Sequence, residues 1–441
     1  MKKFLKGLFI TLLLLVVGVP LLALGGYTIY ALAARGNESP EHIQYLERNH
    51  EVLALTAPAD FTLFDDAFYQ NQIFLLGESH GTTAPQDLDF ALLKHLNAKV
   101  GLRNYIAEID PSQAYYFNTY LQTGDEQNLR LAFQSWINTA QWGNTGFYNK
   151  VKRIYALNKS LPDSVKIRFI GLDRLQNLGI TRQRVQDLLH AAQYKAGSPT
   201  PLDTLQQLLA AEPASEEALS ACARRIERTL ADAPQPYQTK LGAQYADFTH
   251  LVRNITYLEP RVRRDSVMLL NLQAEYQAKN LGHEKMYGLW GVYHVLQGPI
   301  NNGLPLAALL KKSPLPFHDK VVSMPIFLLE SETLMPTAVI PTSVRPTTPY
   351  VAVDWVNQQG PMVFVQGLKD LAKVAPEHAI TLFRLDAAGS PYQHSRQLLD
   401  IKAPLFGQNM SATKPGAVAT DYAQYAFLVR GSKALEPLLK Q

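Results

Sequence analysis

The sequence predicts an α/β fold in which a mainly parallel central sheet is flanked by helices. The prediction rests on apolar runs without polar alternation, which are typical of parallel strands covered on both faces. A turn and a helical pattern follow each early run, and strands that alternate with helices in this way form βαβ units. The first four predicted strands are Ile73–Gly77, Asn104–Ile109, Lys166–Leu172 and Lys285–Val295.

Helical patterns fill the connections between these strands. One helix is expected across Gln86–Leu96 and another across Arg261–Asn280. Residues 180–258 indicate several helices separated by prolines, so we expect a helical insertion or subdomain there. Glu41–Leu55 is expected to form a helix that leads into Phe61–Phe68. Later apolar runs that extend the sheet are Val321–Leu329, Ile380–Leu385 and Tyr425–Val429.

Length and composition indicate a globular body that is close to neutral. The chain has 441 residues, of which 47% are hydrophobic and 10% aromatic, enough for a large core. The net charge is only +4, and three N-terminal lysines account for most of it, so no nucleic-acid partner is expected. Cys222 is the only cysteine, which excludes an intrachain disulfide and a cysteine-based metal site.

The N-terminus carries a long uncharged stretch. Residues 7–34 contain no charged side chain and exceed the roughly 20 residues that span a bilayer as a helix. Lys2, Lys3 and Lys6 precede the stretch, which predicts a cytoplasmic N-terminus and a body outside the cytoplasm. We therefore expect residues 1–35 to be a single-pass membrane anchor, or else a cleaved signal, followed by one domain at 41–441.

Polar residues of catalytic type follow four of the predicted strands. They are Glu78 with His80, then Glu108, then Asp173, then His294. The carboxyl ends of parallel strands lie at one edge of a sheet, so these residues are expected to converge there. A histidine near its ordinary pKa can take a proton from water, and a carboxylate can orient the ring and stabilise its charge.

Each of these residues also has a simpler interpretation. His80 follows a tight turn, where a histidine can also cap a helix, although the pattern of strand ends favours catalysis. His294 is flanked by Tyr293 and Val295, as a core histidine would be. Asp173 fits an N-cap as well as it fits a catalytic group. Glu108 lies in an apolar strand, where a buried carboxylate requires a partner.

The order of these residues resembles the erythromycin esterase-like family. Gly77–Gly81 (GESHG) is similar to its GExxHG-type signature, with one residue fewer between the glutamate and the histidine. The resemblance covers roughly residues 70–435. Its further matches are Asn104–Asp110 (NYIAEID), Ile154–Asp173, Arg264–Asn271 (RDSVMLLN), Trp290–His294 and Tyr425–Pro437.

The resemblance implies metal-independent hydrolysis of a small-molecule ester or lactone, without a cofactor. In that family a histidine matching His80 activates water, supported by glutamates matching Glu78 and Glu108, while one matching His294 stabilises the oxyanion. Arg264 and Asp173 are expected to bind the substrate or the oxyanion, although Arg264 also fits a structural ion pair.

Departures from the family pattern keep two alternatives open. The late strand reads Trp290-Gly291-Val292-Tyr293-His294, where the esterases have W-x-H-N-x-x-H. Its GxxH is more similar to the TIKI/ChaN-type proteins, some of which are metal-dependent proteases or bind haem. One alternative is a metal-dependent hydrolase with His80, Glu78 and His294 as ligands of a divalent metal. The other is a non-catalytic module that binds haem or a lipid.

Overall fold

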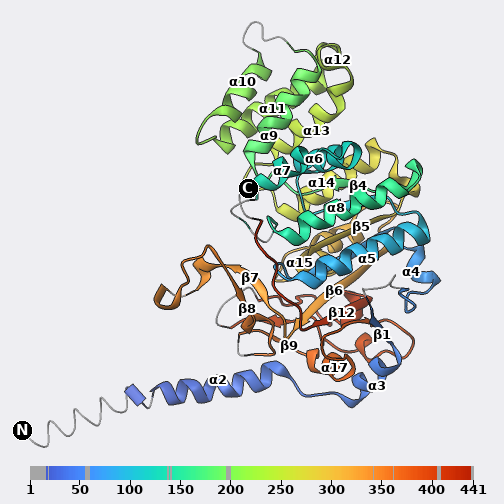
Figure 1. The fold of residues 1–441 in the computed structure, drawn as a ribbon, viewed down its shortest axis with the longest axis vertical. Coiled ribbons are helices and arrows are strands. Elements are labelled where there is room, and N and C mark those ends of the chain that lie inside the picture. Colours follow the sequence, from blue (N-terminus) through green and yellow to red (C-terminus); the bar gives the residue numbers. More distant parts are fainter. Residues whose placement is uncertain are drawn as a thin grey trace, which may run out of the picture.

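The structure is a computed structural model (Figure 1). It describes residues 16–17, 19–54, 60–136, 139, 142–194, 200–340, 342–360, 362–404 and 409–438. The statements below concern these residues.

An eight-stranded sheet organises the fold, in the order β1-β10-β12-β6-β2-β5-β3-β4. The run from β12 to β4 is parallel throughout, and β10 pairs antiparallel with both β12 and β1. The predicted α/β fold with a mainly parallel sheet is therefore confirmed. The strands are β1 (His50–Leu53), β2 (Ile73–Glu78), β3 (Asn104–Ala107), β4 (Arg168–Gly171), β5 (Met286–Gly291), β6 (Val321–Leu329), β10 (Ile380–Arg384) and β12 (Tyr425–Arg430).

Helices cover both faces of the sheet, which explains why its strands lack polar alternation. In β2, Phe74 and Leu76 pack into a core shared with α5 (Thr83–Val100) and α8 (Thr145–Ser160). Ile73 and Leu75 point the other way. Their core includes side chains of α14 (Arg264–Ala278) and α16 (Leu306–Lys312). Every position of β2 is consequently buried.

Five helices between β4 and α14 form a unit with its own hydrophobic core. In Figure 1 they lie together at one end of the molecule, in green and yellow. Leu205, Ile226 and Phe248 are fully buried within this core, which explains the helical patterns of residues 180–258. The helices are α9 (Leu178–Ala191), α10 (Pro201–Ala210), α11 (Glu216–Asp232), α12 (Gln235–Leu241) and α13 (Tyr245–Thr256).

Smaller elements surround the sheet. Two short ribbons pair antiparallel, one from β7 (Thr333–Pro336) and β8 (Tyr350–Val353), the other from β9 (Phe364–Val365) and β11 (Ile401–Lys402). The remaining α-helices are α3 (Pro40–Arg48), α4 (Asp66–Gln70), α6 (Pro111–Thr123), α7 (Glu126–Gln134), α15 (Val292–Val295) and α17 (Leu368–Val374). The 3₁₀ helices are η2 (Asp163–Val165), η3 (Gly242–Gln244), η4 (Leu281–His283), η5 (Thr337–Val339), η6 (Thr342–Val344), η7 (Trp355–Asn357), η8 (Pro391–Gln393) and η9 (Ala419–Asp421).

The predicted membrane anchor needs correction. Part of the predicted span, residues 7–15 and 18, lies outside the described residues, and residues 19–34 of the span lie in helix α2 (Val19–Arg35). Helix α2 has 17 residues, which at about 1.5 Å per residue reach about 26 Å, short of the roughly 30 Å of a bilayer core. Within the described part of the chain, no helix has the length and apolar character to cross a membrane. This finding contradicts the predicted single-pass membrane protein.

Two local predictions are also wrong. The helix expected across Glu41–Leu55 ends at Arg48, and the chain continues as strand β1, which pairs with β10. The strand expected across Lys285–Val295 ends at Gly291. The chain then turns into the short helix α15, so His294 lies on a helix instead of a strand.

A buried ion pair joins α5 and α8 on the face of the sheet that these helices cover. Nζ of Lys150 donates to Oδ2 of Asp89, and both side chains are at most 3% exposed. The hydroxyls of Tyr105 and Tyr287 each donate to the same carboxylate at 2.7 Å. Buried charges are retained in a fold only when they are paired and hydrogen-bonded, so these groups depend on one another.

We expect Lys150→Met to lower the free energy of unfolding by about 3–5 kcal/mol, because it leaves the Asp89 carboxylate buried without its counter-charge. The matched control is Lys152→Met, whose side chain is 44% exposed and pairs with Glu126 at 3.3 Å. That change should cost about 0–1 kcal/mol. Urea denaturation followed by circular dichroism measures both. Equal midpoints for the two variants would contradict the assignment.

Candidate functional site

The carboxyl ends of four neighbouring strands bring the predicted site residues together. Glu78 is the last residue of β2, and Glu108 follows β3 directly. Asp173 lies two residues beyond β4, and His294 follows β5 on α15. Because β2, β5, β3 and β4 are adjacent and parallel, residues distant in sequence meet at one edge of the sheet.

The turn after β2 presents His80 to its neighbour Glu78. Gly81 has φ +103°, and a Cβ there would lie 2.7 Å from the carbonyl oxygen of Leu334, so the turn requires glycine. His80 Nδ1 lies 3.1 Å from Oε1 of Glu78. Gln86 Nε2 donates to both oxygens of Glu78, at 3.1 and 3.2 Å. The Glu78 carboxylate is thus fixed, and it fixes the histidine ring.

The other ring nitrogen of His80 faces the centre of the site. Nε2 lies 4.0 Å from Oε2 of Glu108, and the ring packs against Trp142 with centroids 4.9 Å apart. Burial lowers the pKa of His80, but the hydrogen bond to Glu78 and the charges of Glu78 and Glu108 outweigh burial. The pKa of His80 therefore stands above its ordinary value of 6.5.

Glu108 is buried and is contacted by groups from two other elements. Its Oε2 accepts a hydrogen bond of 2.7 Å from the Gly291 amide, and its Oε1 accepts one of 2.6 Å from Nη2 of Arg264. Burial raises the pKa of Glu108, but the nearby His294, His80 and Arg264 and the Gly291 amide lower it further. The net effect places the pKa of Glu108 at about 2, so the group is ionised at neutral pH.

Gly291 leaves the space in which these side chains meet. A Cβ at this position would lie 3.2 Å from Nε2 of His80 and 3.5 Å from both Oε2 of Glu108 and Cδ2 of His294. A side chain larger than hydrogen would thus occupy the gap between the two histidines and the carboxylate.

Arg264, at the start of α14, is held by two carboxylates. Its Nε and Nη2 donate to Asp173 at 2.9 and 2.5 Å, and Nη2 also reaches Glu108. The Asp173 side chain is 0% exposed, and Gln176 Nε2 donates to it at 2.6 Å. Asp173 therefore lies behind Arg264, where it orients the guanidinium, and is not among the residues that line the cleft.

His294 has a carboxylate partner that sequence analysis missed. Its Nδ1 lies 2.6 Å from Oδ1 of Asp265, and the same oxygen accepts a hydrogen bond from the amide of Leu306 at 2.7 Å. Burial lowers the pKa of His294, but the bond to Asp265 and the charge of Glu108 outweigh it, so this pKa is raised. Nε2 of His294 lies 3.6 Å from Oε1 of Glu108. The only feature of the sequence that pointed to a role for Asp265 is its position next to Arg264.

The carboxylates of the site are already occupied by cationic and amide donors. Among the residues that the structure describes, no three or more His, Cys, Asp or Glu side chains are grouped so as to hold a metal ion. Within the site, His80 bonds Glu78 at 3.1 Å, and His294 bonds Asp265 at 2.6 Å.

A cleft of about 760 Å³ opens above the site. Its polar end is formed by Glu78, His80, Glu108, Arg264 and His294, with Trp142 beside them. This volume lies within the range of small-molecule binding sites, roughly 300–1,000 Å³. The predicted site residues other than Asp173 are therefore accessible from one cleft.

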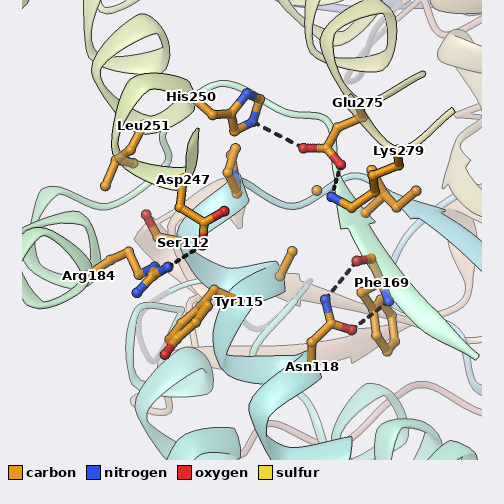
Figure 2. Close-up of a pocket in the computed structure, with 14 residues that line it drawn as sticks. Ser112, Tyr115, Asn118, Phe169, Arg184, Asp247, His250, Leu251, Glu275 and Lys279 are labelled. Carbon is orange, nitrogen blue, oxygen red and sulfur yellow. Dashed lines mark hydrogen bonds and ion pairs between the residues drawn. The ribbon is translucent and has the colours of Figure 1, made fainter. Parts of the chain in front are cut away.

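A second, smaller cavity of about 170 Å³ lies where α6 and β4 meet the helical unit (Figure 2). Its charged side chains pair with one another. Arg184 bonds Asp247 at 2.7 Å, and Glu275 pairs with both His250 and Lys279 (Figure 2). Nδ2 of Asn118 donates to the Phe169 carbonyl, and Oδ1 of Asn118 accepts from the Phe169 amide, in the edge strand β4. These pairings indicate that the cavity lies at a structural contact between the sheet and the helical unit.

Comparison with solved structures identifies the fold. A variant of the erythromycin esterase EreC, in its open conformation, superposes with a TM-score of 0.62 at 14% identity over 87% of this chain and 98% of that one. The chain has the fold of an erythromycin esterase. This confirms the predicted resemblance at the level of fold, with low sequence identity.

Other solved structures share the fold. A Bacillus cereus protein gives a TM-score of 0.65 at 14% identity, covering 90% of this chain and 98% of that one. A succinoglycan biosynthesis protein gives 0.59 at 16% identity, covering 91% and 100%. No protein-family model matches the sequence, and no curated protein does either.

We expect Arg264→Met to lower the free energy of unfolding by about 2–4 kcal/mol, because Asp173 and Glu108 would remain buried without their cation. The control is Arg263→Met at the exposed neighbouring position, which should change stability by less than about 0.5 kcal/mol. Chemical denaturation at pH 7 measures both variants. A loss no larger for Arg264→Met than for Arg263→Met would show that the carboxylates do not depend on the guanidinium.

Proposed function

We propose that the protein is a hydrolase that cleaves an ester or lactone bond of a small molecule with water activated by His80. The observation that carries the proposal is the orientation of His80. A carboxylate can only accept, so the Glu78 contact places the ring proton on Nδ1. Nε2 of the neutral ring then carries a lone pair that faces the cleft and Glu108.

The proposed first step is attack by water on the substrate carbonyl. A separation of 4.0 Å between Nε2 of His80 and Oε2 of Glu108 suits a water that bonds to both atoms. As its oxygen bonds to the carbonyl carbon, one proton passes to Nε2. The resulting imidazolium is stabilised by Glu78 on one side and Glu108 on the other.

The proposed second step returns that proton to the departing oxygen. The tetrahedral oxyanion collapses, the bond between carbon and the alcohol oxygen breaks, and His80 protonates the alcohol. Arg264 and His294 line the same end of the cleft, and Arg264 provides N–H donors for the oxyanion. Because Nδ1 of His294 bonds Asp265, His294 provides an N–H at Nε2 in its imidazolium form, which its raised pKa favours. Asp173 and Asp265 act as positioning residues, since each holds one of these donors in place.

The fold supports the same class of reaction. The structure of similar fold is named an erythromycin esterase, which places ester hydrolysis among the activities this scaffold carries. At 14% identity this likeness concerns the fold, so the proposal depends on the arrangement of His80, Glu78, Glu108 and His294.

We expect His80→Ala to lower kcat/KM on the most active member of an ester and lactone panel by about 10²–10⁴-fold, because the general base is lost. His318→Ala, at an exposed position outside the cleft, is the matched control and should leave activity unchanged. Circular dichroism verifies that both variants are folded. Full activity of His80→Ala would overturn the mechanism, while retained activity in excess chelator separates it from the metal-dependent alternative.

The pH dependence should follow the His80 imidazole. The base acts when neutral and its pKa is raised, so kcat/KM should increase with pH through a midpoint above 6.5. Glu78→Gln removes the hydrogen-bonded negative charge, so the pKa of His80 should fall and the midpoint should shift to lower pH. Glu332→Gln, a surface carboxylate paired with Lys433, is the control. A midpoint that stays in place in Glu78→Gln would exclude His80 as the titrating base.

A further inference from the structure

The two ends of the cleft differ in chemistry. One end holds the charged groups Glu78, His80, Glu108, Arg264 and His294. Most of the other lining residues come from β6, which pairs with β2, and from elements that follow β6 in the chain. These residues, on the β6 side of the cleft, form what we call the far wall.

The far wall is formed mainly by apolar side chains. The end of β6 contributes three consecutive residues, and the others come from β7, β9, β11, α17, two 3₁₀ helices and the segments that connect these elements. Its apolar members are Ile326, Phe327, Leu328, Leu334, Met335, Val339, Trp355, Val356, Val363, Val365, Leu368, Ile401, Ala403 and Met410. Its polar members are neutral: Thr333, Asn357, Gln358 and Gln359. Among the described residues that line the cleft, every charged side chain therefore lies at the catalytic end.

This distribution decides what the cleft can hold. An ionised group placed against the far wall would lose hydration and find no opposite charge to replace it, which is unfavourable. An apolar group placed there would leave water and contact aliphatic side chains, which is favourable in proportion to its area. The cleft therefore discriminates between uncharged and charged substrates through the part of the substrate remote from the reacting bond.

We propose that the substrate is an uncharged ester or lactone with a large apolar part, which lies along the far wall while its carbonyl lies beside His80. This inference rests on the proposed hydrolase function and adds the substrate class to it. The apolar part is recognised by burial, and the polar end of the cleft is reserved for the ester group.

The first test is a series of 4-nitrophenyl esters with acyl chains from two to twelve carbons. We expect kcat/KM to increase about 3- to 4-fold per methylene group while the chain extends along the far wall. Esters of the longer acids with a terminal carboxylate or trimethylammonium group should lose that gain. Equal rates for the shortest and longest chains, or for the charged and uncharged ends, would overturn the substrate class while hydrolysis itself stands.

A substitution in the far wall provides the second test. Val339, 46% exposed, lines the cleft on η5, and Val344, 70% exposed on the neighbouring η6, does not. Val339→Glu should shift preference from the neutral long-chain ester toward its trimethylammonium analogue by about threefold. Val344→Glu should leave that ratio unchanged. An equal shift in both variants would show that the cleft is not the origin of the preference.

A binding experiment separates failure of this inference from failure of the proposed function. The neutral fluorescent probe N-phenyl-1-naphthylamine should bind the intact chain and be displaced by dodecanol, but not by the doubly charged dodecanedioate. Displacement together with no hydrolysis of any ester would overturn the hydrolase function while the apolar site stands. Displacement by dodecanedioate as readily as by dodecanol would overturn the apolar site.

Discussion

The carboxylate of Glu108 is the group on which the arrangement of the site depends. It follows β3, yet it accepts hydrogen bonds from the end of β5 through Gly291 and from α14 through Arg264. Both histidine rings approach it, at 3.6 and 4.0 Å. A buried carboxylate without such partners would be protonated or would destabilise the fold. The requirement to satisfy one charge thus fixes the relative positions of three elements.

The two histidines differ in the origin of the carboxylate that bonds to Nδ1. His80 is bound to Glu78 two residues earlier in the same turn, so its partner is supplied locally. His294 is bound to Asp265 on α14, and Asp265 also accepts the amide of Leu306 at the start of α16. The first ring is therefore oriented by the turn itself, and the second by the packing of helices against the sheet edge. Raised pKa values for both rings follow from the same negative surroundings.

Sequence reasoning located those parts of the site that depend on strand ends. Glu78, His80 and Glu108 follow unbroken apolar runs, and parallel strands necessarily align their carboxyl ends. The role of Asp265 and the helical setting of His294 depend on contacts between segments that are about 30 residues apart, for which no local pattern exists. Strand β1 has only four residues, which are too few to show the alternation of apolar and polar residues that distinguishes a strand from the preceding helix. Residues 19–34 of the uncharged N-terminal run lie in α2, whose 17 residues are too few to span a bilayer, because the absence of charge in a sequence does not set the length of a helix.

The confinement of charge to one end of the cleft affects catalysis as well as the choice of substrate. When an apolar group covers the far wall, water is displaced from the neighbouring polar end, and the interactions of Glu108, His80 and Arg264 become stronger in the lower dielectric. Each methylene that binds along β6 thus contributes to affinity and also to the environment in which the His80 imidazolium forms. A short substrate leaves the same charges hydrated. Chain length should consequently affect kcat together with KM, because burial and proton transfer occur in one continuous space.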